Sequence, residues 1–97
     1  MTVMIFEPEK REYITEIDNT LEALQEAVGG YIEVVGLSGG LALVCNEEGK
    51  LMGLAPNRYC APLNDTICGT FLICGTDGDE FCSLTEEQAG MYENMFR

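Results

Sequence analysis

Two short apolar segments constrain the fold of this 97-residue sequence more than any other feature. Leu41–Cys45 (LALVC) and Gly69–Gly75 (GTFLICG) contain runs of consecutive apolar side chains rather than alternating ones. Such runs are typical of strands in the middle of a sheet, because an outer strand usually keeps one polar side. We therefore predict that both segments are central strands of a β-sheet.

Segments with alternating or β-branched residues predict further strands around these two. They are Thr2–Phe6, Glu12–Ile17, Tyr31–Leu37 and Leu51–Leu54. The first pair predicts a hairpin, and Gly49 suits the positive φ of a turn before the last strand. Ala55–Thr66 contains Pro56 and Pro62 and is predicted to be an irregular loop, while Thr76–Glu80 is predicted to be an acidic turn.

Two helices complete the predicted elements. The first begins at Asn19, whose spacing to Glu22 resembles a capping box, and ends at Gly29. The second begins at Ser83, which has the same spacing to Glu86. The apolar stripe predicted for the first helix consists of Leu21, Leu24 and Val28.

The order of these elements predicts an α+β fold. We expect a single small domain over residues 1–97, with a mostly antiparallel sheet of about five to six strands and two helices on one face of the sheet.

The charge balance excludes several classes of function. The chain has 17 Asp and Glu residues, five Lys and Arg residues and no His, which gives a net charge of -12. Phosphate groups would be repelled, so we expect neither direct nucleic-acid binding nor binding to anionic membranes. Without His, the chain lacks the commonest general base, and we predict a protein that is not an enzyme and has no cofactor.

The cysteines point to a reducing compartment. Five is an odd number, and no pair has the Cys-x-x-Cys spacing of a metal site. We expect reduced thiols that behave as small buried hydrophobes, and no metal. The sequence also has no apolar run long enough to span a membrane and no signal peptide at its start, so we expect a cytoplasmic protein in the cytosol of the host cell.

Asn57, Arg58 and Tyr59 are the first candidate site. On so acidic a chain, Arg58 has two interpretations. It pairs with a carboxylate of the protein, or its planar fork grips a phosphate or carboxylate of a ligand while Tyr59 stacks on a ring. Both interpretations stay open from the sequence.

The acidic residues of the two helices are the second candidate site. They are Glu22 and Glu26 on the first helix and Glu86, Glu87 and Glu93 on the second. With both helices on one side of the sheet, these side chains would form a single negative face. Such a face either only keeps the protein soluble or mimics the phosphates of a nucleic acid and attracts a basic protein surface.

Four segments together resemble a family of small proteins carried by phages and integrative elements of gut bacteria, a family known only as a domain of unknown function. They are Glu16–Val34, Ala42–Arg58, Gly69–Gly75 and Ser83–Gln88 (SLTEEQ). The resemblance covers almost the whole chain and implies a mobile-element context. It supplies no reaction and no site residues.

Charge, the lack of catalytic groups and the implied context together favour a counter-defence protein. We expect its acidic surface to bind and inhibit a host defence protein that has a basic surface and acts on nucleic acid, such as a restriction or CRISPR effector. Two alternatives remain: a protein that sequesters a nucleotide immune signal through Asn57, Arg58 and Tyr59, and an accessory interaction module. A homodimer is also left open.

Overall fold

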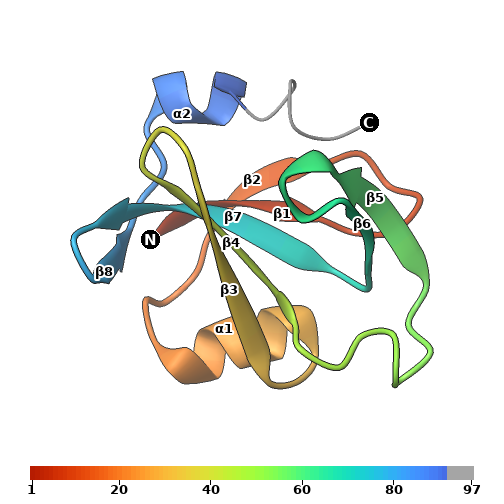
Figure 1. The fold of residues 1–97 in the computed structure, drawn as a ribbon. Helices are drawn as coiled ribbons and strands as arrows, with labels where there is room; N and C mark the ends of the chain where they lie inside the picture. Colours follow the sequence, from red (N-terminus) through yellow and green to blue (C-terminus); the bar gives the residue numbers. More distant parts are fainter. Residues whose placement is uncertain (92–97) are drawn as a thin grey trace.

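A computed structural model describes residues 1–91 of the chain. Its main sheet has six strands in the order β2-β1-β7-β4-β3, with β8 also paired to β7, and every pairing is antiparallel (Figure 1). The strands of this sheet are β1 (Thr2–Phe6), β2 (Tyr13–Glu16), β3 (Ile32–Leu37), β4 (Leu41–Asn46), β7 (Phe71–Asp77) and β8 (Glu80–Cys82). Two helices, α1 (Leu21–Val28) and α2 (Glu86–Met91), confirm the predicted fold class.

The two apolar segments form the middle of the sheet, as predicted. β7 lies between β1 and β4, and β4 lies between β7 and β3. All six residues of β4 are buried, and β7 is buried from Phe71 to Gly75. The predicted hairpin of the first two strands is also present.

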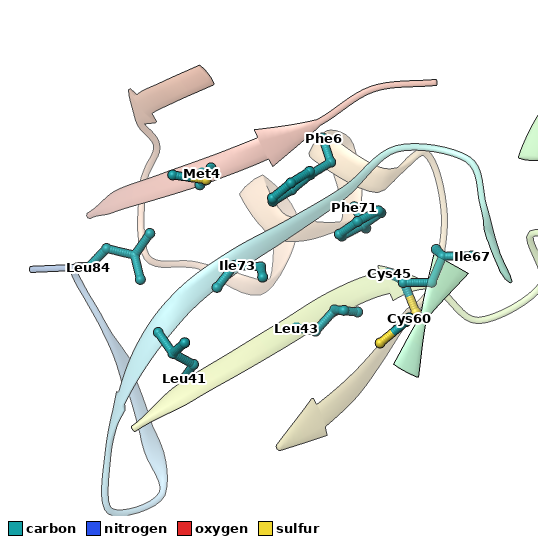
Figure 2. Packing of buried hydrophobic residues seen from close by; sticks show 10 residues of the cluster. All are labelled: Met4, Phe6, Leu41, Leu43, Cys45, Cys60, Ile67, Phe71, Ile73 and Leu84. Carbon is teal, nitrogen blue, oxygen red and sulfur yellow. The ribbon is translucent and has the colours of Figure 1, made fainter. Parts of the chain in front are cut away.

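The sheet has a separate core on each face. We call one the α1 face, because α1 packs on it; its buried residues are Val3, Ile5, Leu24, Val28, Ala42, Val44, Leu72 and Cys74. We call the other the α2 face; its buried residues, drawn in Figure 2, are Met4, Phe6, Leu41, Leu43, Cys45, Cys60, Ile67, Phe71, Ile73 and Leu84. Ala89 of α2 packs against this second core.

The helices therefore lie on opposite sides of the sheet, and the prediction of one shared face is wrong (Figure 1). The physical reason is the run of apolar residues in the central strands. Successive side chains of a strand point to opposite faces, so both faces of β4 and β7 need a cover that excludes water.

The starts of both helices differ from the prediction by one or more residues. Thr20, rather than Asn19, caps α1, because its hydroxyl accepts the Ala23 N–H at 3.1 Å. Asn19 instead donates to the Phe81 carbonyl.

At the second helix, the capping box is formed by Thr85 and Gln88. The Thr85 hydroxyl accepts the Gln88 N–H, and the Gln88 side-chain oxygen accepts the Thr85 N–H, each at 3.1 Å. Ser83, which was predicted to cap this helix, instead accepts the N–H of Thr2 and ties the end of β8 to β1.

The region between the central strands also differs from the prediction. Leu51–Leu54 forms consecutive turns and not a strand, and Leu51 is 86% exposed. The predicted loop Ala55–Thr66 contains a second small sheet, made of β5 (Pro56–Cys60) and β6 (Asp65–Cys68) with a 3-10 turn (Ala61–Leu63) between them. This small sheet covers one end of the α2 face with Cys60 and Ile67.

Candidate functional site

The Arg58 side chain ties β5 to the loop between β1 and β2. Its Nη1 donates to the Glu7 carbonyl at 2.8 Å, and its Nη2 donates to the Lys10 carbonyl at 2.7 Å. Nη2 also lies 3.4 Å from a carboxylate oxygen of Glu12. Arg58 therefore has the carboxylate partner that one interpretation predicted, together with two carbonyl partners that neither interpretation predicted.

Asn57 extends this arrangement to β1 and to the start of β7. Its amide nitrogen donates to the carbonyls of Phe6 and Gly69, both at 2.9 Å, and its oxygen accepts from Arg58 Nη1 at 2.8 Å. We call the two residues the Asn57–Arg58 clamp. Every polar atom of the Asn57 side chain is thus used inside the protein.

Aromatic rings support the clamp from below. The Arg58 guanidinium lies 5.3 Å from the centre of the Phe6 ring, a cation–π distance. The Phe6 ring stacks on Phe71, with 4.7 Å between ring centres and 5° between planes; Figure 2 shows the two rings side by side in the core. Tyr59 turns away to bond the Asn64 side chain within the β5–β6 hairpin.

The clamp is therefore built as a structural element. A ligand anion would have to displace two carbonyls, an amide and a carboxylate from a side chain that is only 18% exposed. The three predicted ligand-binding residues are neighbours, but the structure gives each of them a partner within the chain.

A cleft of about 790 Å³ lies on the α1 face, between α1 and the β1–β2 hairpin. Four carboxylates line it: Glu7, Glu16, Asp18 and Glu26. Among residues 1–91, no Lys or Arg side chain lines it. Its remaining wall comes from Met1, Ile5, Tyr13, Thr15, Ile17, Ala23, Ala27 and Thr70. We call it the acidic cleft.

The carboxylates of the acidic cleft differ in how far their charge is neutralised. Glu7 lies 3.8 Å from Lys10, and Glu16 lies 3.8 Å from the terminal amine. Within residues 1–91, Asp18 and Glu26 have no ion-pair partner. Burial and the nearby Glu7 carboxylate raise the pKa of Tyr13 in the cleft, so this phenol stays neutral to a higher pH than an ordinary tyrosine.

A second hollow of about 310 Å³ extends the acidic cleft along α1. The acidic cleft and this second hollow share Glu26, Ala27 and Thr70 in their linings. The second hollow is also lined by Leu54 and Ala55. Glu26 therefore stands at the junction of a groove that follows one side of the helix.

The predicted acidic face is divided by the sheet. Glu22 and Glu26 are exposed on α1, whereas Glu86 and Glu87 are exposed on α2 at the other face. Glu93 lies outside the described residues. One continuous face of all five residues is therefore not formed, and only Glu26 belongs to the acidic cleft.

Sequence reasoning missed three of the cleft carboxylates, Glu7, Glu16 and Asp18. They belong to the β1–β2 loop, to β2 and to the segment before α1, and only the packing of the hairpin beside α1 brings them together. The available signal was the excess of carboxylates near the predicted hairpin, at Glu7, Glu9, Glu12, Glu16 and Asp18.

The thiols are mostly inert core residues. Cys45, Cys60 and Cys74 are buried, as predicted, while Cys68 and Cys82 are partly exposed. Burial raises the pKa of Cys45 and of Cys74 to about 11, so both remain protonated near neutral pH. Among residues 1–91, no group of three or more His, Cys, Asp or Glu side chains is arranged to hold a metal ion.

Comparison with known proteins gives one match. A family model described as a domain of unknown function (DUF3846) matches residues 1–97. No curated protein and no solved structure matches the chain significantly. In the part of the chain that the structure describes, no helix is long and apolar enough to cross a membrane.

Proposed function

The chain belongs to the DUF3846 family of unknown function, and from this premise we propose that it binds a basic protein surface without catalysing a reaction. In this proposal it is a counter-defence protein of a phage or mobile element. It inhibits a host immune effector that acts on nucleic acid, of the restriction or CRISPR type, by occupying the effector's basic surface.

The observation that carries the proposal is the acidic cleft. It combines a concave shape with four carboxylates, and no Lys or Arg side chain of the described residues 1–91 is in its lining. A partner's Lys or Arg side chains would enter a negative potential there, and complementary charge both accelerates association and selects the partner. The net charge of -12 extends the same attraction over the rest of the molecule.

The alternative of a sequestered nucleotide signal has less support. A nucleotide needs cationic donors for its phosphates, and the Arg58 donors are bonded within the Asn57–Arg58 clamp. The acidic cleft, which at about 790 Å³ exceeds the adjoining hollow of about 310 Å³, would repel an anion. The alternative of an accessory interaction module would use the same acidic surface to bind a partner. It differs from the proposal only because this binding would not inhibit a host defence effector.

Charge reversal on the two helices tests the proposal and provides its own control. Glu22→Lys with Glu26→Lys changes the α1 face, and Glu86→Lys with Glu87→Lys makes the same change in charge on the other face. All four side chains are exposed, so both variants are expected to fold. Melting temperature verifies this for each.

The readout is the plating efficiency of a sensitive phage on cells that carry a defined restriction or CRISPR system and express each variant. We expect the α1 variant to protect the phage from the defence system at least about tenfold less than the wild type, the effect of losing roughly 1.4 kcal/mol of binding free energy. The α2 variant should keep most of the protection. Rising salt should weaken the purified complex, because exposed charge pairs are screened. Full protection by the α1 variant, or stabilisation of the wild type by nucleotides alone, would refute the proposal.

A further inference from the structure

The outer edge of β3 has a row of backbone groups with no partner in the part of the chain that the structure describes. The N–H of Glu47 donates to the carbonyl of Tyr31 at 2.8 Å, which makes Tyr31 and Glu47 a hydrogen-bonded pair of the β3–β4 ladder. Because such pairs alternate along antiparallel strands, Ile32, Val34 and Gly36 point their N–H and C=O groups away from β4. Within residues 1–91, no other group bonds to these outward groups.

This edge lacks the usual protection of an outer strand. Proteins commonly protect an edge with proline, a bulge, a very short strand or charged side chains. β3 runs through six residues (IEVVGL) in unbroken register with β4, without proline and with Glu33 as its one charge. The opposite edge strand, β2, has four residues, ends at Glu16 and follows the charged pair Arg11 and Glu12.

The two sides of the β3 edge differ in chemistry. On the α1 face Val34 is 46% exposed, and the space beside Gly36 is open. On the α2 face a hollow of about 160 Å³ adjoins Glu33, with the apolar side chains of Cys45, Leu63 and Ile67 in its wall.

The charges in this hollow are mostly negative. Its carboxylates are Glu33, Glu47 and Asp65, and its one cation, Lys50, is bonded to Asp65. Three negative groups against one positive group leave a net charge of -2 at the α2 side of the edge. On the α1 side, an added strand would therefore meet an apolar surface. On the α2 side, it would meet carboxylates around Glu33 and the partly buried Val35 and Leu37 further along β3.

We propose that the β3 edge binds an extended segment of a partner protein that alternates apolar residues with Lys or Arg. The segment pairs antiparallel with β3 and adds a strand to the sheet. Its apolar residues lie opposite Ile32, Val34 and Gly36 on the α1 face, and its cationic residues lie beside Glu33 on the α2 face. This inference rests on the proposed function in one respect, since both require a basic partner.

A second copy of the chain fits the edge less well. Each copy carries a net charge of -12, so pairing two β3 edges would bring like charges together and place Glu33 and Glu47 of both copies along one seam. A cationic segment removes this repulsion and supplies the same main-chain bonds. Self-association is therefore an alternative outcome of the experiment.

The experiment uses the full chain and a fluorescein-labelled hexapeptide of alternating Lys and Val, followed by fluorescence anisotropy. In the antiparallel register the Val residues direct their N–H groups to β3, and the Lys residues direct theirs to solvent. N-methylation of the Val residues should weaken binding by at least about tenfold, since it removes up to three hydrogen bonds. N-methylation of the Lys residues leaves composition and charge matched and should weaken binding far less.

Two proline variants of the chain give a matched comparison. Val34→Pro removes an outward N–H of β3 but no bond of the β3–β4 ladder, which is where an edge strand tolerates proline. Ile14→Pro does the same at the outer edge of β2. Val34→Pro should lower the affinity for the peptide by about tenfold or more, and Ile14→Pro should leave it unchanged.

Each outcome decides between explanations. Equal binding of the peptides methylated on Val and on Lys would show attraction by charge alone and overturn the proposal, even if Val34→Pro did not fold. A dimer of the wild type in analytical ultracentrifugation that Val34→Pro converts to monomer would assign the edge to self-association instead. The phage assay separates the two hypotheses. If the Val34→Pro variant still protects the phage while the Glu22→Lys, Glu26→Lys variant does not, the β3 site is refuted and the proposed function stands.

Discussion

Two regions of the molecule, the Asn57–Arg58 clamp and the acidic cleft, use charge in opposite ways. On the α2 face, Arg58 pairs with Glu12 and two carbonyls above the Phe6 ring, and Lys50 pairs with Asp65. On the α1 face, Asp18 and Glu26 line an open cleft without an ion-pair partner among residues 1–91. A chain with only five cations thus places two of them where they hold the small β5–β6 sheet in position.

This difference assigns different roles to the two regions under the proposed function. The Arg58 guanidinium packs on the stacked rings of Phe6 and Phe71 and stabilises the fold. Asp18 and Glu26, which have no ion-pair partner among residues 1–91, make no comparable contact and are the groups that we propose meet a partner. The comparison therefore predicts that substitutions in the Asn57–Arg58 clamp and in the aromatic stack beneath it reduce stability, and that charge substitutions at the acidic cleft reduce binding.

The largest effect should come from removing the aromatic stack. Phe71 is fully buried and lies against Phe6, so Phe71→Ala leaves a cavity and should lower the free energy of unfolding by about 3–5 kcal/mol. Urea unfolding followed by circular dichroism measures this loss. Leu51→Ala is the control, because Leu51 is 86% exposed and its truncation should change stability by less than about 0.5 kcal/mol. Similar losses in the two variants would contradict the burial that the structure gives Phe71.

A smaller loss is expected from the Asn57–Arg58 clamp. Arg58→Ala removes charge-assisted hydrogen bonds to the carbonyls of Glu7 and Lys10 and should destabilise the protein by about 1.5–3 kcal/mol. An exposed ion pair would contribute at most about 1 kcal/mol, so the size of the loss distinguishes a clamp from a surface pair.

Arg58→Lys sharpens the same measurement. It keeps the charge but loses the planar fork that reaches two carbonyls at once, so it should recover only part of the stability. Neither variant should change binding through the acidic cleft once the measurement is made below its melting temperature. If the folded Arg58→Lys variant lost binding, Arg58 would be a ligand-binding residue, and an anionic ligand would be favoured.

The central sheet could be predicted from sequence because its signal is local. The apolar runs of β4 and β7 and the glycines and polar turns between strands specify which segments are extended. The same runs also indicate two covered faces, which the prediction of both helices on one face did not take into account.

The candidate sites depend on contacts between distant segments and were therefore harder to predict. Asn57 and Arg58 were identified as candidates, but the Phe6 and Glu7 carbonyls that they bond are 51 residues away in the chain, so the sequence could not distinguish a clamp from a ligand site. The acidic cleft likewise joins Glu7 to Glu26 through packing alone. The strands β5 and β6 were not predicted, because Pro56 and Pro62 in this segment are typical of a loop.

The effect that should be smallest at neutral pH comes from the thiols of Cys45 and Cys74, one in the core of each face, and it should appear only at high pH. Burial raises the pKa of Cys45 on the α2 face and of Cys74 on the α1 face from 9.0 to about 11, with the Glu33 carboxylate adding to the effect at Cys45. Between pH 9 and 11 the unfolded chain releases these protons while the folded chain retains them. Stability from this source is therefore complete below pH 9 and is lost as the pH rises toward 11. Urea unfolding of the wild type and of a Cys45→Ala, Cys74→Ala variant over this range measures the difference, because Tyr and Lys titrate equally in both proteins. The wild type should lose more stability on going from pH 8.5 to 10.5 than the variant does, whereas parallel pH dependence would show that neither thiol is shielded from water in either core.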